Sequence, residues 1–174
     1  MAKERNIFER GFDLESFKQF FDDHFTEIKN FIYYKTSAVD ISEDLAQECF
    51  LKVWERREKI NPETAKNYLY TVAKNLAVDH IKKQKSFFTF INKKQKTDDG
   101  ETPLYVLEEK EFDQQLQKAI ADLTEKQRVV FLMNRIDDLT YKEIAGRLGL
   151  SVKAVEKRMM QALKLLKEQI AQKI

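Results

Sequence analysis

A run of charged and amide side chains between positions 153 and 164 is the part of this sequence best suited to chemistry with a partner. Such side chains hydrogen-bond to base edges or to phosphate oxygens, and one helix face can present several of them. Apolar residues recur among them at the spacing of a helix with one buried stripe: Val155, Met159, Ala162 and Leu166. The residues that face away from this stripe are Lys153, Glu156, Lys157, Met160, Gln161 and Lys164.

Residues 140–158 (TYKEIAGRLGLSVKAVEKR) have the spacing of a helix-turn-helix. A small residue, Ala145, is followed four positions later by Gly149 and six positions further on by Val155. Ala145 lets two helices cross closely, and Gly149 can adopt the positive φ of a tight turn. Ser151 then stands where it can cap the second helix.

Position along this second helix predicts the role of each residue. The N-terminal half of a recognition helix reaches base edges, while flanking basic residues hold phosphates. A merely solvated charged face is the alternative, and the turn spacing favours DNA binding. We expect base contacts from Glu156, Lys157 and Gln161, with Met160 beside them, and backbone contacts from Lys153, Arg158 and Lys164.

Residue types that catalyse reactions are sparse. The two histidines, His24 and His80, fit neither a His-x-x-x-His pattern nor a nucleophile–base pair. The single cysteine, Cys49, excludes an internal disulfide and a cysteine-built zinc site, and it lies on an apolar stripe where an inert thiol is expected. With no phosphate-cradling glycine loop either, we predict no catalysis, no metal site and no cofactor.

Composition favours an all-α protein. The 174 residues include four Gly and two Pro, fewer than the turns of a β-rich fold require. Net charge is +2, and the positive excess lies in residues 113–174, which hold 12 Lys/Arg against 8 Asp/Glu. No stretch approaches the roughly 20 apolar residues of a membrane span, and the N-terminus resembles no secretory signal. We therefore expect a cytoplasmic protein without membrane insertion.

Helical periodicity divides the chain into two small helical domains. Residues 1–86 form the first, with a buried stripe on its first helix, a second helix beginning after Asp40 or Ser42, and a last helix over about residues 65–83. Residues 87–112 form a flexible linker containing an apolar patch at 87–91, for which packing on the first domain is favoured over partner binding. Residues 113–174 form a four-helix domain that contains the helix-turn-helix. The first buried stripe comprises Leu14, Phe17, Phe21, Phe25, Ile28 and Ile32.

Three stretches together resemble the extracytoplasmic-function (ECF) group of bacterial RNA polymerase sigma factors. Residues 42–54 (SEDLAQECFLKVW) resemble the core-binding helix of that group, and residues 67–79 (NYLYTVAKNLAVD) resemble its −10 promoter helix. Residues 123–131 (LTEKQRVVF), with the helix-turn-helix, resemble its −35 domain. The three in this order, separated by a linker of this length, are highly specific.

The resemblance implies a polymerase contact and a −10 site. In the ECF group the first stretch docks on a basic coiled coil of the β′ clamp, which assigns Asp44, Gln47 and Glu48 to core binding; the β flap is a second contact. Asn75 matches the asparagine at the pocket for a flipped −10 base, lined by the loop at 59–66, and Tyr68 stands where many relatives have Trp. The implied −10 set is Asn67, Tyr68, Lys74, Asn75, Lys82 and Lys83.

The resemblance also implies partners and leaves one alternative. Relatives carry more positive charge near Glu156 and Gln161, so we expect a −35 sequence different from theirs. The expected partners are RNA polymerase core, promoter DNA and an anti-sigma factor, and the free protein is expected to be a monomer. The alternative is a conventional helix-turn-helix regulator with an N-terminal dimerisation or ligand domain. It explains residues 113–174 but not the other two stretches.

Overall fold

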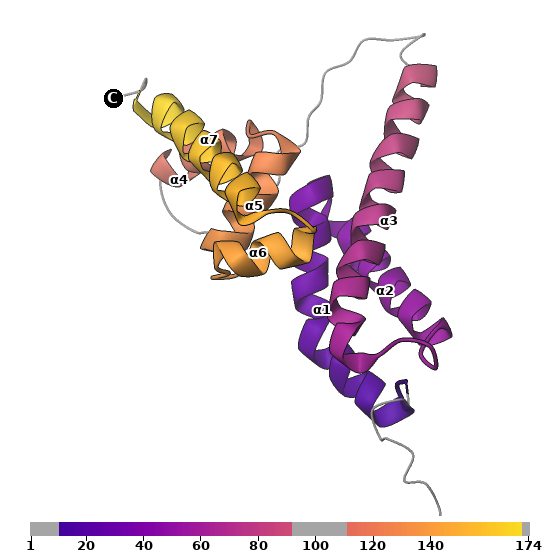
Figure 1. Ribbon diagram of the computed structural model, residues 1–174. Helices are drawn as coiled ribbons and strands as arrows, with labels where there is room; N and C mark the ends of the chain where they lie inside the picture. The colour runs from indigo at the N-terminus through magenta and orange to yellow at the C-terminus, as the bar shows by residue number, and fades with distance from the viewer. Residues whose placement is uncertain (1–10, 92–110, 172–174) are drawn as a thin grey trace, which may run out of the picture.

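A computed structural model of the protein describes residues 11–91 and 111–171, and within them every regular element is an α-helix. No helix of this described part is long and apolar enough to cross a membrane. The predicted all-α fold is thus confirmed. The N-terminal group contains α1 (Leu14–Thr36), α2 (Val39–Glu55) and α3 (Pro62–Ile91), and the C-terminal group contains α4 (Glu111–Ala121), α5 (Glu125–Arg135), α6 (Tyr141–Leu148) and α7 (Val152–Ala171) (Figure 1).

The N-terminal helices pack around a core rich in aromatic rings. Ile28, Ile32 and Val53 are fully buried, and the ring of Phe50 lies 5.9 Å from that of Phe20. Of the expected stripe on α1, Ile28 and Ile32 are buried and the three phenylalanines are partly buried, but the stripe is wrong at Leu14, which is 73% exposed. Leu14 occupies the first turn of α1, where it lines an open groove.

Helix α2 begins earlier than the sequence predicted. Its N-cap is Ala38, not Asp40 or Ser42. The reason is the sharp turn at Ser37, whose φ of 58° ends α1 and reverses the chain within two residues. Ser42 is therefore inside the helix, where its hydroxyl donates to the carbonyl of Val39 at 2.6 Å.

Helix α3 is longer than predicted. Pro62 occupies its first position, where a missing N–H costs nothing, and Asn61 accepts a hydrogen bond from the backbone of Glu63 at 2.9 Å. The helix continues to Ile91, past position 83 and into the segment assigned to the linker, because no Gly or Pro interrupts it. The side-chain packing of residues 87–91 and the polar tether at 93–103 lie outside what the structure describes.

Capping boxes begin two of the C-terminal helices. The amide oxygen of Gln127 accepts from the backbone N–H of Thr124 at 3.1 Å, which begins α5. Thr140 and Glu143 do the same for α6. A small apolar cluster then joins α4 to α7: Ala119, Leu123, Ala162 and Leu166.

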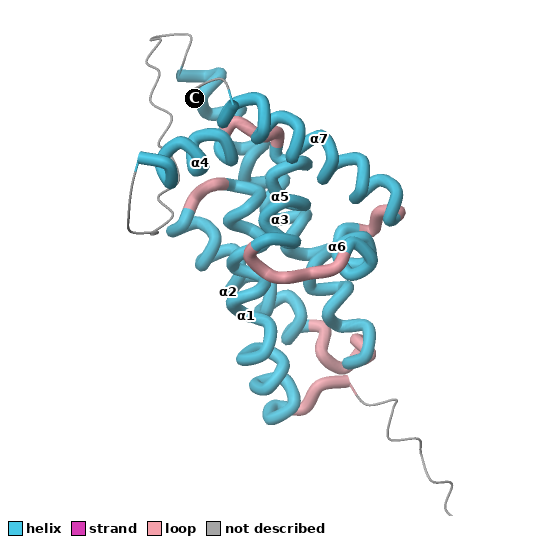
Figure 2. Tube along the Cα trace, turned by 90° about the vertical axis from the view of Figure 1, so that its left-hand side faces the viewer, coloured by secondary structure: helices cyan, strands magenta, loops and turns pink. Residues whose placement is uncertain are grey.

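The two helical groups pack against each other. Helix α5 contacts α1, and α6 contacts α3, an arrangement visible in two perpendicular views (Figures 1 and 2). Buried residues of both groups belong to one continuous apolar cluster that includes Ile32, Val129 and Ile144. The sequence predicted two domains joined by a linker and gave no indication of this contact.

Candidate nucleic-acid interface

The turn between α6 and α7 has the geometry that the sequence predicted. Gly149 adopts φ 64° and ψ 40°, in the left-handed region. The chain then reverses so that the N–H of Leu150 reaches the carbonyl of Ala145 at 2.9 Å. Ser151 follows, and its hydroxyl accepts from the N–H of Ala154 at 3.2 Å. The first turn of α7 is thereby fixed relative to α6.

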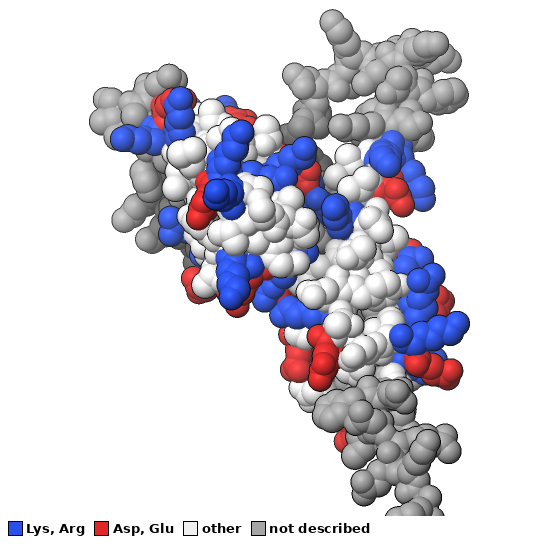
Figure 3. Space-filling model, viewed as in Figure 1, with Lys and Arg blue, Asp and Glu red and all other residues white. Residues whose placement is uncertain are grey.

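Helix α7 has one buried and one exposed face. All four predicted stripe residues are buried, with Val155 and Ala162 fully so. The opposite face is open to solvent, and Lys and Arg side chains gather over α7 (Figure 3). Lys164 pairs with Glu168 at 3.9 Å, but both side chains are more than half exposed, so little holds them together. The exposed residues are Lys153, Glu156, Lys157, Met160, Gln161 and Lys164.

Arg158 differs from the other predicted α7 contacts. It is half-buried and lines a pocket of about 230 Å³ between the two helical groups. Lys74 of α3, predicted as a −10 contact, lines the same pocket. The structure therefore brings together one cation from each predicted DNA-binding region.

A second exposed polar face runs along α3. Asn67, Lys74 and Asn75 are exposed at separations of seven and eight residues, two helical turns, and so lie on one side of the helix. Lys82 continues this side, and Lys83 is also exposed but lies about 180° around the helix from Lys74.

A cavity of about 630 Å³ opens at the start of α3, lined mainly by the loop that the sequence singled out. Tyr68 forms one wall, and its hydroxyl accepts a hydrogen bond from Arg56 at 3.1 Å. Arg56 was missed, because it precedes the predicted loop and carried no motif. The lining residues are Arg56, Lys59, Ile60, Asn61, Thr64 and Tyr68.

Asn75 does not line this cavity. It lies seven residues beyond Tyr68, about 10 Å further along the helix at 1.5 Å per residue. The expected meeting of Asn75 with the loop at 59–66 is thus not found, and Asn75 instead shares the exposed face with Lys74.

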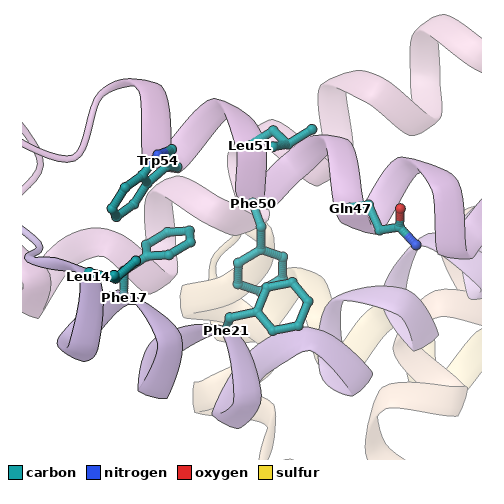
Figure 4. Close-up of a pocket in the computed structure, with 7 residues that line it drawn as sticks. All are labelled: Leu14, Phe17, Phe21, Gln47, Phe50, Leu51 and Trp54. Atoms are coloured by element: carbon teal, nitrogen blue, oxygen red, sulfur yellow. The ribbon is translucent and has the colours of Figure 1, made fainter.

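The predicted core-binding residues lie on α2. Asp44 and Gln47 are exposed, and Glu48 is half-buried with a 3.3 Å ion pair to Lys52. Gln47 also borders an apolar groove of about 520 Å³ between α1 and α2 (Figure 4). The sequence did not predict this groove, which is lined by Leu14, Phe17, Phe21, Gln47, Phe50, Leu51 and Trp54.

The groove exposes more apolar surface than the stripe pattern implied. Leu51 is 60% exposed, and Trp54 is half-buried with its ring 4.8 Å from that of Phe17. Large exposed apolar surfaces mark contacts with other macromolecules. The sequence did contain an indication of this groove, because the apolar residue Leu51 lies outside the buried stripe of α2 that contains Cys49 and Val53.

Cys49 is buried among apolar neighbours. Burial raises the pKa of its thiol to about 12, so the thiol stays protonated and unreactive at neutral pH. This agrees with the inert role expected from its position on the stripe.

Comparison with known families matches two separate stretches of the chain. The sigma-70 region 2 family matches residues 20–87, which hold the α2 face, the cavity and most of α3. The sigma-70 region 4 family matches residues 113–166, which hold the helix-turn-helix. The chain therefore belongs to the sigma-70 family of RNA polymerase sigma factors, which are DNA-binding transcription factors.

Its relatives include members of the ECF group. The ferric citrate uptake sigma factor FecI of Escherichia coli is 26% identical over 150 residues, 85% of this chain and 87% of FecI. The ECF sigma factor SigW of Bacillus subtilis is 26% identical over 170 residues, 91% of this chain and 90% of SigW. The fold matches that of RpoE from Bartonella quintana, solved in complex with the anti-sigma factor NepR, with a TM-score of 0.68 and 19% identity over 91% and 98% of the two chains.

Proposed function

We propose that this ECF-type sigma factor recognises a promoter through two separate sites on one chain. The exposed polar face of α7 reads the −35 duplex, and the cavity with the exposed face of α3 holds the melted −10 strand. The main support for this proposal is that both surfaces are present, one in the part that matches sigma-70 region 2 and the other in the part that matches region 4. Polymerase makes the RNA, so the protein supplies no catalysis, and we place it in the cytoplasm with the polymerase.

At the −35 element, the tight turn at Gly149 presents the N-terminal half of α7 to the major groove. Lys157 and Gln161 donate to base acceptors, and Glu156 accepts from a cytosine amino group. Lys153, Arg158 and Lys164 hold phosphates. Arg158 can do so only after it leaves the pocket between the helical groups.

At the −10 element, the cavity accepts a base flipped out of the stack. Tyr68 offers an aromatic face for stacking, and the basic side chains of Arg56 and Lys59 draw the strand into place. Beyond the cavity, Asn75 contacts a neighbouring base while lysines follow the phosphates. The strand-tracking residues are Asn67, Lys74, Lys82 and Lys83.

The exposed face of α2 docks on polymerase core. Asp44, Gln47 and Glu48 meet basic side chains of the β′ clamp in charge-assisted hydrogen bonds. The adjoining apolar groove adds buried area to the same contact, with Leu51 at its rim. The C-terminal group meets the β flap.

Two solved relatives suggest a regulator. RpoE of Bartonella quintana is bound to the anti-sigma factor NepR, and CnrH, 19% identical to this chain with a TM-score of 0.62, is bound to the cytosolic domain of CnrY. We infer that an anti-sigma protein holds this chain inactive. Without a partner we expect a monomer.

Run-off transcription tests the proposal. Core polymerase alone is expected to give no specific transcript on promoters of the source organism, and adding this protein is expected to produce one. The variant Lys157→Ala should change which promoters are used while core binding is kept. A specific gel shift by the protein alone, with no transcript when core is added, would instead indicate a conventional helix-turn-helix regulator.

A further inference from the structure

One carboxylate joins three helices at the contact between the two helical groups. Oε1 of Glu27 in α1 lies 2.5 Å from Nη1 of Arg147 in α6. The same carboxylate accepts from the hydroxyl of Tyr70 in α3 at 2.6 Å and from the ammonium of Lys66 at 3.0 Å. The guanidinium of Arg147 also lies 5.6 Å from the centre of the Tyr70 ring.

This group of charges is largely shielded from water. The side chains of Glu27 and Arg147 are 18% and 14% exposed, and Tyr70 is buried. Burial by itself raises the pKa of Glu27, but hydrogen bonds from His24, Tyr70 and Lys66, with the charge of Arg147, outweigh it and lower the pKa to about 2. The ion pair is therefore formed at neutral pH.

A second set of contacts crosses the same boundary between α1 and the C-terminal group. Lys35 forms an ion pair with Glu125 of α5, and the Lys35 side chain is 9% exposed. The hydroxyl of Tyr34 donates to Asp137 at 3.0 Å, and Nε of Arg128 donates to the Tyr34 carbonyl at 3.1 Å. A cation as shielded as Lys35 is stable only beside a partner, and Glu125, which is 37% exposed, supplies that partner.

The contact also covers part of one predicted DNA-binding residue, Arg158. The pocket of about 230 Å³ that holds Arg158 and Lys74 is also lined by Lys35 and Lys126, and Glu125 is the one acid among its described lining residues. Its volume is below the roughly 300 Å³ of the smallest ordinary ligand pockets, so no nucleic acid strand enters it. In this arrangement Arg158, which is half-buried, is partly withheld from DNA, whereas Lys74 stays exposed.

We propose that Glu27, Lys35 and Tyr70 on one side and Glu125 and Arg147 on the other form an intramolecular latch, which must open before the protein binds promoter DNA. The latch docks the helix-turn-helix group onto α1 and α3 in the free protein. Its consequence for DNA binding rests on the function proposed above, whereas its existence does not.

The latch lowers DNA affinity in proportion to its stability. If the closed state outnumbers the open state by roughly 100 to 1, the free protein binds DNA roughly 100-fold more weakly than its open form does. Polymerase core or another partner that binds the open form relieves this cost.

The sharpest test reverses one charge. Glu125→Lys places a fifth cation in a pocket that already holds four, which should open the latch. Glu15→Lys is the matched control, because it makes the same charge change in the first turn of α1, away from the contact. Two quantities are measured on the full chain. X-ray scattering gives the radius of gyration, and fluorescence anisotropy gives the affinity for a mixed-sequence DNA duplex at low salt.

We expect Glu125→Lys to have a larger radius of gyration than Glu15→Lys and to bind the duplex about fivefold more tightly or better, the low end of typical couplings. Adding Lys35→Glu to Glu125→Lys restores an ion pair and should return both values toward those of the wild type. Arg147→Glu, which brings an acid against Glu27, should also increase the radius.

Each outcome decides something. If Glu125→Lys and Arg147→Glu both stay as compact as Glu15→Lys, with helix content unchanged by circular dichroism, the latch is wrong even if the protein supports transcription. If the radius increases and the double variant reverses it, the latch stands even if run-off transcription fails. If Glu125→Lys or Arg147→Glu loses helix content, the other of these two variants is used in its place.

Discussion

Tyr68, proposed to stack on a base, is held in place by a neighbouring side chain. Its ring forms a wall of the cavity before α3, and its hydroxyl is held by Arg56 at 3.1 Å. The hydrogen bond restricts the ring, so the face that we propose meets a base is already oriented. Preorganisation of this kind lowers the entropy lost on binding.

Replacing Tyr68 by Ala should therefore impair promoter opening. Stacking of a base on an aromatic ring contributes about 1–3 kcal/mol, so open complex measured by permanganate reactivity should decrease roughly tenfold. Tyr68→Phe keeps the ring and loses only the Arg56 contact, so it should retain most activity. Equal loss in both variants would mean that the hydroxyl, and not the stacking face, is what matters.

Glu27 links stability to pH. Its pKa in the folded protein, about 2, is below the ordinary 4.5, so its contribution is fully present above about pH 5 and is lost as the pH falls toward 2. Glu27→Gln should cost about 1–3 kcal/mol in unfolding free energy at pH 7, because Arg147 and Lys66 lose a charged partner. Urea denaturation at several pH values measures both effects.

Comparing the wild type with Glu27→Gln separates the titration of Glu27 from that of acids that are not coupled to it. Asp13 and Glu143 also have lowered pKa values, through hydrogen bonds to Ser16 and Thr140, but they are present in both proteins. The difference in stability should thus shrink steadily between pH 5 and pH 2. A constant difference across that range would show that Glu27 is not the titrating group.

At the scale of elements, the α6–α7 turn depends on one backbone conformation. Gly149 ends α6 in the left-handed region, whereas Gly146 lies inside α6 with ordinary helical geometry. A methyl group added at either position meets no atom within 4 Å. The two glycines therefore differ only in backbone energetics.

Substitution by alanine should move stability in opposite directions at these two sites. Gly149→Ala should lower the unfolding free energy by about 1–2 kcal/mol, the cost of a left-handed residue with a side chain. Gly146→Ala should raise it by roughly 0.5–1 kcal/mol, because alanine favours a helix interior. Urea denaturation of the two variants checks this, and a loss of stability at Gly146 would contradict it.

For the whole molecule, the two surfaces that we propose bind DNA belong to helical groups that contact each other. The free protein should therefore bind a duplex carrying both promoter elements with a dissociation constant in the non-specific range, about 10⁻⁴ to 10⁻⁶ M. With polymerase core present, both surfaces act together, and the same fragment should be retained far more tightly than mixed-sequence DNA. Fluorescence anisotropy with and without core measures this, and sequence-specific nanomolar binding by the free protein would refute it.

Local features were predictable because their causes lie within a few residues. The capping boxes at Thr124 and Thr140 and the positive φ of Gly149 need only neighbours three or four positions away. The buried stripe of α7 follows from helical periodicity, and all four of its residues are buried. Where a local signal was misleading, as at the start of α2, the turn at Ser37 decided the boundary.

The sequence by itself determined the helices, the helix-turn-helix and its exposed polar face, and the three stretches that resemble ECF sigma factors. Only the tertiary structure decided that the two helical groups touch, that Arg158 and Lys74 share a pocket, and that Asn75 lies outside the cavity. The physical reason is distance along the chain. Glu27 and Arg147 are far apart in sequence. A charged residue that pairs across a tertiary contact has the same sequence pattern as one that faces solvent, so the sequence does not reveal the pair.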